Sequence, residues 1–105
     1  MGIYYQVIAN LVQKYSDPCA SLYSRLKSMS DKSRLEIFRI LKASEFNGLD
    51  LSEKLGLAPT TISYHMNMLV REGFVSVSKR GTGIYYTLNT ASLRRFVQEL
   101  EHFLL

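Results

Sequence analysis

Residues 50–72 contain two helix-like segments separated by a break of only a few residues. The first segment ends at Gly56, a residue type that commonly follows the last turn of a helix. The second segment opens at Pro59, which suits the first helical position. Its apolar residues recur every three or four positions, and they are Ile62, Met66, Leu69 and Val70. Two helices joined by so short a turn predict a helix-turn-helix.

The hydrophobic period changes after Gly73. Apolar and polar residues alternate from there to Leu88, a pattern typical of strands. The segment 79–83 contains two glycines and two cations and divides this stretch in two. Residues 74–88 are therefore predicted to form a β-hairpin, which we call the wing.

Helical spacing precedes and follows these two motifs. Residues 3–29 are predicted to form two N-terminal helices, because Asp17 can cap a helix that Pro18 opens. Residues 90–104 carry a continuous apolar stripe and are predicted to form a last helix. The predicted fold is mainly α with a β-hairpin wing, a winged helix-turn-helix that spans residues 1–105 as one domain.

One more helix is predicted between the N-terminal helices and the helix-turn-helix. It is expected to begin at Ser30 or Asp31, where Ser33 and Glu36 resemble a capping box. Residues 45–48 are then predicted to form a loop that leads into the helix-turn-helix.

The composition narrows the class of function. A length of 105 residues with 47% hydrophobic residues fits one globular domain. The net charge of +4 favours nucleic acid or another anionic partner. The single cysteine, Cys19, excludes an intrachain disulfide, so a cytoplasmic location is expected. No apolar run approaches the ~18 residues of a membrane helix, and no nucleophile pattern predicts catalysis or a bound cofactor.

The second helix of the helix-turn-helix presents a polar face opposite its apolar stripe. An α-helix fits the major groove of B-DNA, where short polar side chains read base edges, and cations of a neighbouring wing contact phosphates. These features predict a DNA-binding surface that includes Thr60, Thr61, Ser63, Tyr64, Asn67, Lys79, Arg80 and Thr82. The basic stretch 25–42 carries a net charge of +4 and is expected to flank the duplex. The alternative is a winged-helix module that binds protein, in which the polar face is merely solvated.

From Leu26 onward the sequence resembles the ArsR/SmtB family of winged-helix repressors. The matching stretches span about three quarters of the chain in the family's order. They are LKSMSDKSRLEI at 26–37, LSEKLGL at 51–57, TISYHMNML at 61–69, GFV at 73–75, Gly81 and YYTL at 85–88. The resemblance implies a homodimer that represses transcription from an inverted-repeat operator until an inducer releases it. It also implies that base-reading positions fall on Pro59, Thr60, Ser63 and Tyr64, the last of which is Arg in many relatives.

The resemblance also raises the question of a metal sensor. Metal sensors of this family carry a Cys-x-Cys near the helix that here reads LDLSE at 49–53, so that site is absent and no metal is predicted. A second family site would retain only Glu99 and His102. Two copies of this pair across a dimer could supply the four ligands of Zn²⁺, but such side chains are more often solvated than metal-bound. His65 is predicted to be structural, at the edge of the buried stripe. Cys19 is predicted to be a small buried residue rather than a redox switch.

The terminal helices carry more apolar surface than a small core can cover. Pairing of two chains would hide this surface and would set two reading helices about one turn of DNA apart. The predicted dimer interface comprises Val7, Leu11, Leu93, Phe96, Val97, Leu100, Phe103 and Leu104. The alternative is that this surface docks on a missing sensor domain, in which case the chain is the DNA-binding part of a larger regulator. Double-stranded DNA, a second copy and a small-molecule inducer are thus the expected partners.

Overall fold

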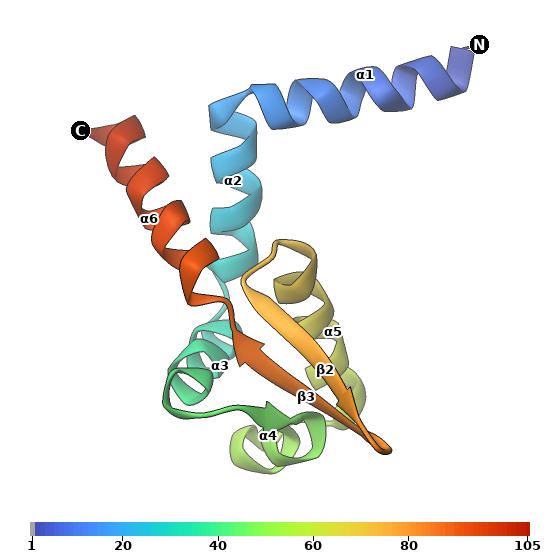
Figure 1. Ribbon diagram of the computed structural model, residues 1–105, viewed down its shortest axis with the longest axis vertical. Helices are drawn as coiled ribbons and strands as arrows, with labels where there is room; N and C mark the ends of the chain where they lie inside the picture. The colour runs from blue at the N-terminus through green and yellow to red at the C-terminus, as the bar shows by residue number, and fades with distance from the viewer. Residues whose placement is uncertain (1) are drawn as a thin grey trace.

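The computed structural model describes residues 2–105, with the side chains of residues 10–16 outside the description. Helices make up most of the chain, and three short strands form one small sheet (Figure 1). The predicted winged helix-turn-helix fold is confirmed. The elements in chain order are α1 (Gly2–Ser16), α2 (Pro18–Met29), α3 (Lys32–Ala43), β1 (Phe46–Asn47), α4 (Gly48–Leu55), α5 (Pro59–Arg71), β2 (Val75–Arg80), β3 (Gly83–Leu88) and α6 (Thr90–Leu104).

The helix ends follow the local sequence, with one difference from expectation at the start of α3. Asp17 caps α2 by accepting a hydrogen bond from the amide of Cys19 at 3.0 Å, as predicted. Asp31 caps α3 through the amide of Arg34, so the expected capping box of Ser33 and Glu36 is wrong. Because the helix begins at Lys32, Ser33 lies inside the first turn and is not the N-cap residue that a capping box requires.

The wing is an antiparallel hairpin in which Val75 pairs with Leu88 and Arg80 pairs with Gly83. Its two-residue tip begins at Gly81, whose φ of 60° lies in the left-handed region that glycine adopts without strain. The strand β1 pairs with the outer edge of β3, which gives the sheet order β1-β3-β2.

The expectation of a loop over residues 45–48 is wrong in part. Phe46 and Asn47 form β1, and Asn47 also caps α4 by accepting from the amide of Asp50 at 2.8 Å. A two-residue strand is too short to show an alternating pattern, and its pairing with distant residues leaves no local signal. The predicted end of α4 at Gly56 is confirmed by a φ of 65°.

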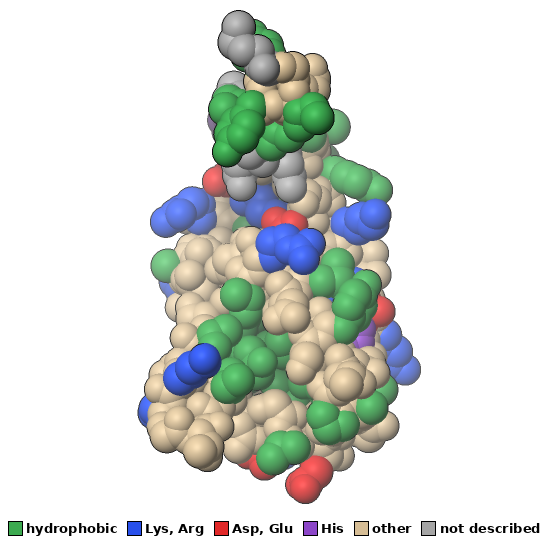
Figure 2. Space-filling view, turned by 90° about the vertical axis from the view of Figure 1, so that its right-hand side faces the viewer, with side chains coloured by type: hydrophobic (Ala, Val, Ile, Leu, Met, Phe, Trp, Pro, Cys, Tyr) green, Lys and Arg blue, Asp and Glu red, His purple; other side chains and the backbone are tan. Residues whose placement is uncertain are grey.

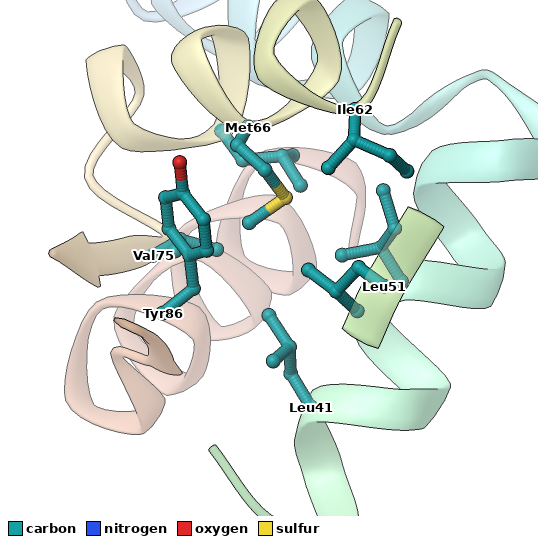
Figure 3. Close-up of a cluster of buried hydrophobic side chains, with 8 residues drawn as sticks. Leu41, Leu51, Ile62, Met66, Val75 and Tyr86 are labelled. Carbon is teal, nitrogen blue, oxygen red and sulfur yellow. The ribbon is translucent and has the colours of Figure 1, made fainter. Parts of the chain in front are cut away.

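The main hydrophobic core lies between α3, α4, α5 and the sheet (Figure 3). Full burial of an aliphatic side chain contributes about 1.5–3 kcal/mol, and several of these side chains are fully buried. Burial also raises the pKa of the Tyr86 hydroxyl above its ordinary value. The buried members are Ile37, Leu41, Leu51, Ile62, Met66, Leu69, Val75 and Tyr86. This core therefore fixes the inner face of α5 and orients its outer face.

A second, smaller cluster joins α2 and α6 to the turn that follows α5. It consists of Leu22, Phe74 and Phe96, and the rings of Phe74 and Phe96 lie 5.4 Å apart. Phe96 is only 3% exposed within one chain. The prediction that Phe96 lies in a dimer interface is therefore wrong, because its side chain is buried in the core of its own chain.

The helix α1 extends away from the rest of the molecule (Figure 1). The apolar side chains at its free end, among them Ile3, Val7 and Ile8, are more than half exposed. Leu11, which was predicted to lie in a dimer interface, is among the residues whose side chains lie outside the description. In the described part of the chain, no helix is long and apolar enough to cross a membrane.

Candidate nucleic-acid interface

The two faces of α5 differ sharply in exposure. Its inner face is buried through Ile62, Met66 and Leu69. Its outer face is exposed through Pro59, Thr60, Ser63, Tyr64 and Asn67, whereas Thr61 is half-buried. The structure thus brings together on one side of one helix the short polar side chains that the sequence singled out.

The first turn of α5 has no side-chain cap. Ala58 stands at the cap position and makes no side-chain hydrogen bond, and Pro59 has no amide hydrogen. The N-terminal end of a helix carries a partial positive charge, and its free amides bind phosphate oxygens. This end of α5 therefore complements the polar outer face.

A buried arginine holds α5 from behind. The side chain of Arg34 donates to Nδ1 of His65 at 3.0 Å and to the carbonyl oxygen of Ser28 at 2.5 Å, and it also contacts the sulfur of Met68. A guanidinium only donates, so Nδ1 of His65 accepts and the ring proton lies on Nε2. His65 is buried, in agreement with the structural role predicted for it.

The basic stretch 25–42 is less available to a partner than its charge suggests. The guanidinium of Arg34 is buried and binds within the chain, so Arg34 does not belong to the surface expected to flank the duplex. Arg25 also binds within the chain, with Nη2 2.6 Å from Oε2 of Glu99. Of the six cations in this stretch, Lys27, Lys32, Arg39 and Lys42 lie exposed. Nothing in a linear run of cations distinguishes the buried from the exposed ones.

The two cations at the wing tip are not equivalent. Nη2 of Arg80 lies 2.5 Å from Oε1 of Glu45, and the guanidinium stacks over the ring of Tyr85 at 4.0 Å. The hydrogen bond to Glu45 raises the pKa of Arg80 above its ordinary value. Lys79 and Thr82 are exposed, and Lys79 has no ion pair among the described residues. A duplex phosphate would meet Lys79 directly but would have to displace Glu45 from Arg80.

The remaining candidate residues do not assemble a site. Cys19 is exposed rather than buried, because it lies on the outer side of the first turn of α2. The carboxylate of Glu99 pairs with Arg25, so it is not available as a second metal ligand beside His102. Across the described residues, no group of three or more His, Cys, Asp or Glu side chains is arranged to hold a metal ion.

Comparison with known proteins connects this geometry to a family. The model of the bacterial regulatory protein arsR family matches residues 31–77, which run from the cap of α3 into β2. The chain is 40% identical over 75 residues to the arsenical resistance operon repressor of Staphylococcus aureus, covering 71% of this chain and 72% of that protein. It is 31% identical over 78 residues to the transcriptional repressor SdpR of Bacillus subtilis, covering 74% and 87%.

The chain belongs to the ArsR family. Among solved structures, an ArsR-like transcriptional regulator from Rhodococcus superposes with a TM-score of 0.73 and 30% identity, covering 80% of this chain and 79% of that one. HlyU of Vibrio cholerae superposes with a TM-score of 0.67 and 28% identity, covering 82% and 94%. The resemblance stated from the sequence is confirmed. As an ArsR-family member the chain is a DNA-binding transcriptional regulator and not an enzyme.

Proposed function

We propose that this chain represses transcription by binding an inverted-repeat operator as a homodimer, with α5 of each copy in a major groove. The observation that carries the proposal is the contrast between the two faces of α5. One face is buried in the core, and the other is exposed and polar. A rigid helix with an uncovered polar face is what direct readout of base edges requires.

Each exposed side chain of α5 has a distinct use in this arrangement. The amide of Asn67 is able to pair with adenine through two hydrogen bonds. The hydroxyls of Thr60 and Ser63 donate to phosphate or base acceptors. Tyr64 is 61% exposed and offers an apolar ring to a thymine methyl group together with a hydroxyl. Lys79 at the wing tip would bind the neighbouring backbone and release a counterion.

The homodimer rests on exposed apolar side chains of the terminal helices. On α6, Val97 is 58% exposed and Leu104 is 66% exposed, whereas Leu93 and Leu100 are half-buried against the chain's own core. Figure 2 shows further hydrophobic side chains gathered at the free end of α1. Exposed apolar side chains of this kind mark an interaction site. Pairing about a two-fold axis covers it and sets two α5 helices about 34 Å apart.

Repression, rather than activation, is proposed from the relatives. Four of the five curated relatives are named repressors, whereas HlyU is named a transcriptional activator. The arsenical link in the name of one relative is not carried over to this chain. Arsenic(III), a soft ion, favours thiolate ligands, and the sequence contains Cys19 alone. Binding to an operator in a bacterial cell would also place the protein in the cytoplasm.

Selection of bound sites from random duplexes tests this proposal. We expect enriched sites with two inverted half-sites whose centres lie about 10 base pairs apart. Affinity for them should fall steeply as salt is raised. Enrichment of a single unsymmetrical element would contradict the dimer, and the absence of any enrichment would contradict DNA reading by α5. A reporter gene placed behind the selected site should lose expression when the protein is present.

A further inference from the structure

We propose that the half-open pocket between α2, α6 and the C-terminal end of α5 binds a small organic anion with an apolar body. This pocket has a volume of about 760 Å³ and lies at the opposite end of α5 from its exposed first turn. Sites for small molecules typically measure about 300–1,000 Å³. The volume is therefore adequate for a ligand much larger than a simple ion.

The floor of the pocket is apolar. Leu22 and Phe74 line it, and both belong to the cluster that joins α2 to α6. Because Leu22 and Phe74 are only 4% and 1% exposed, most of the apolar surface open to a ligand comes from Phe103, which is 50% exposed, and from the exposed Pro18. Contact with these apolar side chains favours a ligand with an aromatic or aliphatic body.

The walls carry an excess of positive charge. Three arginines and two glutamates line the pocket. One glutamate, Glu99, pairs with Arg25, and the other, Glu72, accepts a hydrogen bond from the hydroxyl of Ser24 at 2.7 Å. The remaining cations, Arg71 and Arg95, have no ion pair among the described residues. A guanidinium binds a carboxylate through two parallel hydrogen bonds, so these two side chains favour an organic anion.

The pocket lies on a different flank of α6 from the surface proposed for dimerisation. At about 100° per residue, Ser92, Arg95 and Glu99 lie on one side of Phe96, whereas Val97 and Leu104 lie on the other. The first three line the pocket, and the last two are exposed apolar residues outside it. Phe103, which the sequence predicts for the interface, also lines the pocket. A second copy that covers Val97 and Leu104 therefore leaves the pocket accessible.

A bound anion would act on the reading helix directly. Arg71 is the last residue of α5, and Glu72 is its C-cap, so one wall of the pocket is the end of that helix. The hydrogen bond from Ser24 ties this end to α2. A ligand held between Arg71 and Arg95 therefore has different contacts for different positions of α5 relative to α6, which is the condition for coupling. This coupling rests on the proposed DNA-binding function, whereas the binding of the anion does not.

Calorimetric titration of the full chain tests the pocket, with benzoate, 1-naphthoate and octanoate as probes. We expect saturable binding of at least one carboxylate, and binding of neutral benzamide and of inorganic phosphate weaker by about tenfold or more. The variant Arg95→Ala should weaken carboxylate binding by about tenfold or more. Arg94→Ala, which removes the neighbouring exposed arginine outside the pocket, should leave it unchanged.

Three results would overturn the proposal that this pocket binds an organic anion. They are no saturable binding of any of the three carboxylates, equal binding by phosphate, and equal losses in Arg95→Ala and Arg94→Ala. A change in oligomeric state caused by Arg95→Ala, measured by sedimentation, would also overturn it, because it would assign this surface to the second copy. Thermal unfolding of both variants checks that each retains the fold.

Titration of a selected duplex with and without the bound carboxylate tests the coupling. We expect the ligand to weaken duplex binding by about fivefold or more, and the duplex to weaken ligand binding by the same factor. Unchanged duplex affinity would contradict the coupling. If the protein bound the carboxylate but no duplex, the repressor proposal alone would be refuted. If it bound the duplex but no carboxylate, the pocket proposal alone would be refuted.

Discussion

The outer face of α5 and the outer faces of α1 and α6 are both exposed, but their side chains differ in kind. Thr60, Ser63 and Asn67 on α5 are small and polar, whereas Val97 and Leu104 on α6 are apolar. Polar side chains are well solvated in water, so the outer face of α5 is suited to a polar partner that binds reversibly. Exposed apolar surface is unfavourable in water, so the outer faces of α1 and α6 favour a partner that stays bound.

The two regions also differ in what supports them. Behind the outer face of α5 lie Ile62, Met66 and the bonded pair of Arg34 with His65. Behind the free end of α1, the described part of the chain provides no such support, and its apolar residues face outward. The outer face of α5 is thus supported within one chain, whereas we propose that a second copy covers the apolar side chains of the terminal helices.

The largest effect is expected from charges in the apolar face of α6. The double variant Val97→Asp and Leu104→Asp should weaken the dimer by about 3–5 kcal/mol, because unpaired carboxylates would be buried. Sedimentation equilibrium should show a shift to monomer. The matched variant Arg94→Asp and Gln98→Asp, on the exposed polar side of α6, should stay dimeric. If the first variant remained dimeric as well, the apolar face would not be the interface.

The next effect concerns the support of α5. Arg34→Met should lower the free energy of unfolding by about 2–3 kcal/mol, because it leaves Nδ1 of His65 and the carbonyl of Ser28 without their donor. Arg39→Met changes an exposed arginine of the same helix and should alter stability by no more than about 0.5 kcal/mol. Urea unfolding of both variants measures the difference, and equal midpoints would show that the buried arginine contributes nothing.

A smaller effect is expected on the reading face itself. Tyr64→Ala should weaken binding to a selected duplex by roughly 1–3 kcal/mol while leaving binding to random duplex nearly unchanged. Tyr23→Ala removes a tyrosine of similar exposure on α2 and serves as the control. Fluorescence anisotropy titrations on both duplexes separate the two outcomes. Equal losses on specific and random DNA would mean that Tyr64 does not read bases.

The smallest effect distinguishes the two cations of the wing. Lys79→Ala should lower the slope of log affinity against log salt by about one, equally for all sequences. Glu45→Gln should strengthen duplex binding modestly, because it frees Arg80 from its ion pair, and Arg80→Ala should cancel that gain. Titrations at several salt concentrations measure both quantities. An unchanged slope in Lys79→Ala would place the wing away from the duplex.

The sequence predicted the elements that have a long periodic pattern and missed those that depend on distant partners. The helices around Leu69 and Phe96, the hairpin and the end of α4 at Gly56 follow from local spacing and turn chemistry. The strand β1 exists only because Phe46 pairs with Tyr86, forty residues away in the sequence. Such pairing has no local signature.

The candidate site shows the same division. The exposure of Thr60, Ser63 and Asn67 could be predicted, because exposure on a helix follows its periodicity. The burial of Arg34 and the pairing of Arg80 with Glu45 could not, because they depend on which elements pack together in space. Apolar spacing likewise could not separate Phe96, which is buried in its own chain, from Val97, which is exposed.

Hydroxyl-radical footprinting of the selected duplex tests most directly whether two copies of α5 read DNA together. We expect two protected patches related by two-fold symmetry and separated by about one helical turn. Tyr64→Ala should reduce both patches equally. A single patch, or protection that persists unchanged in this variant, would contradict the account.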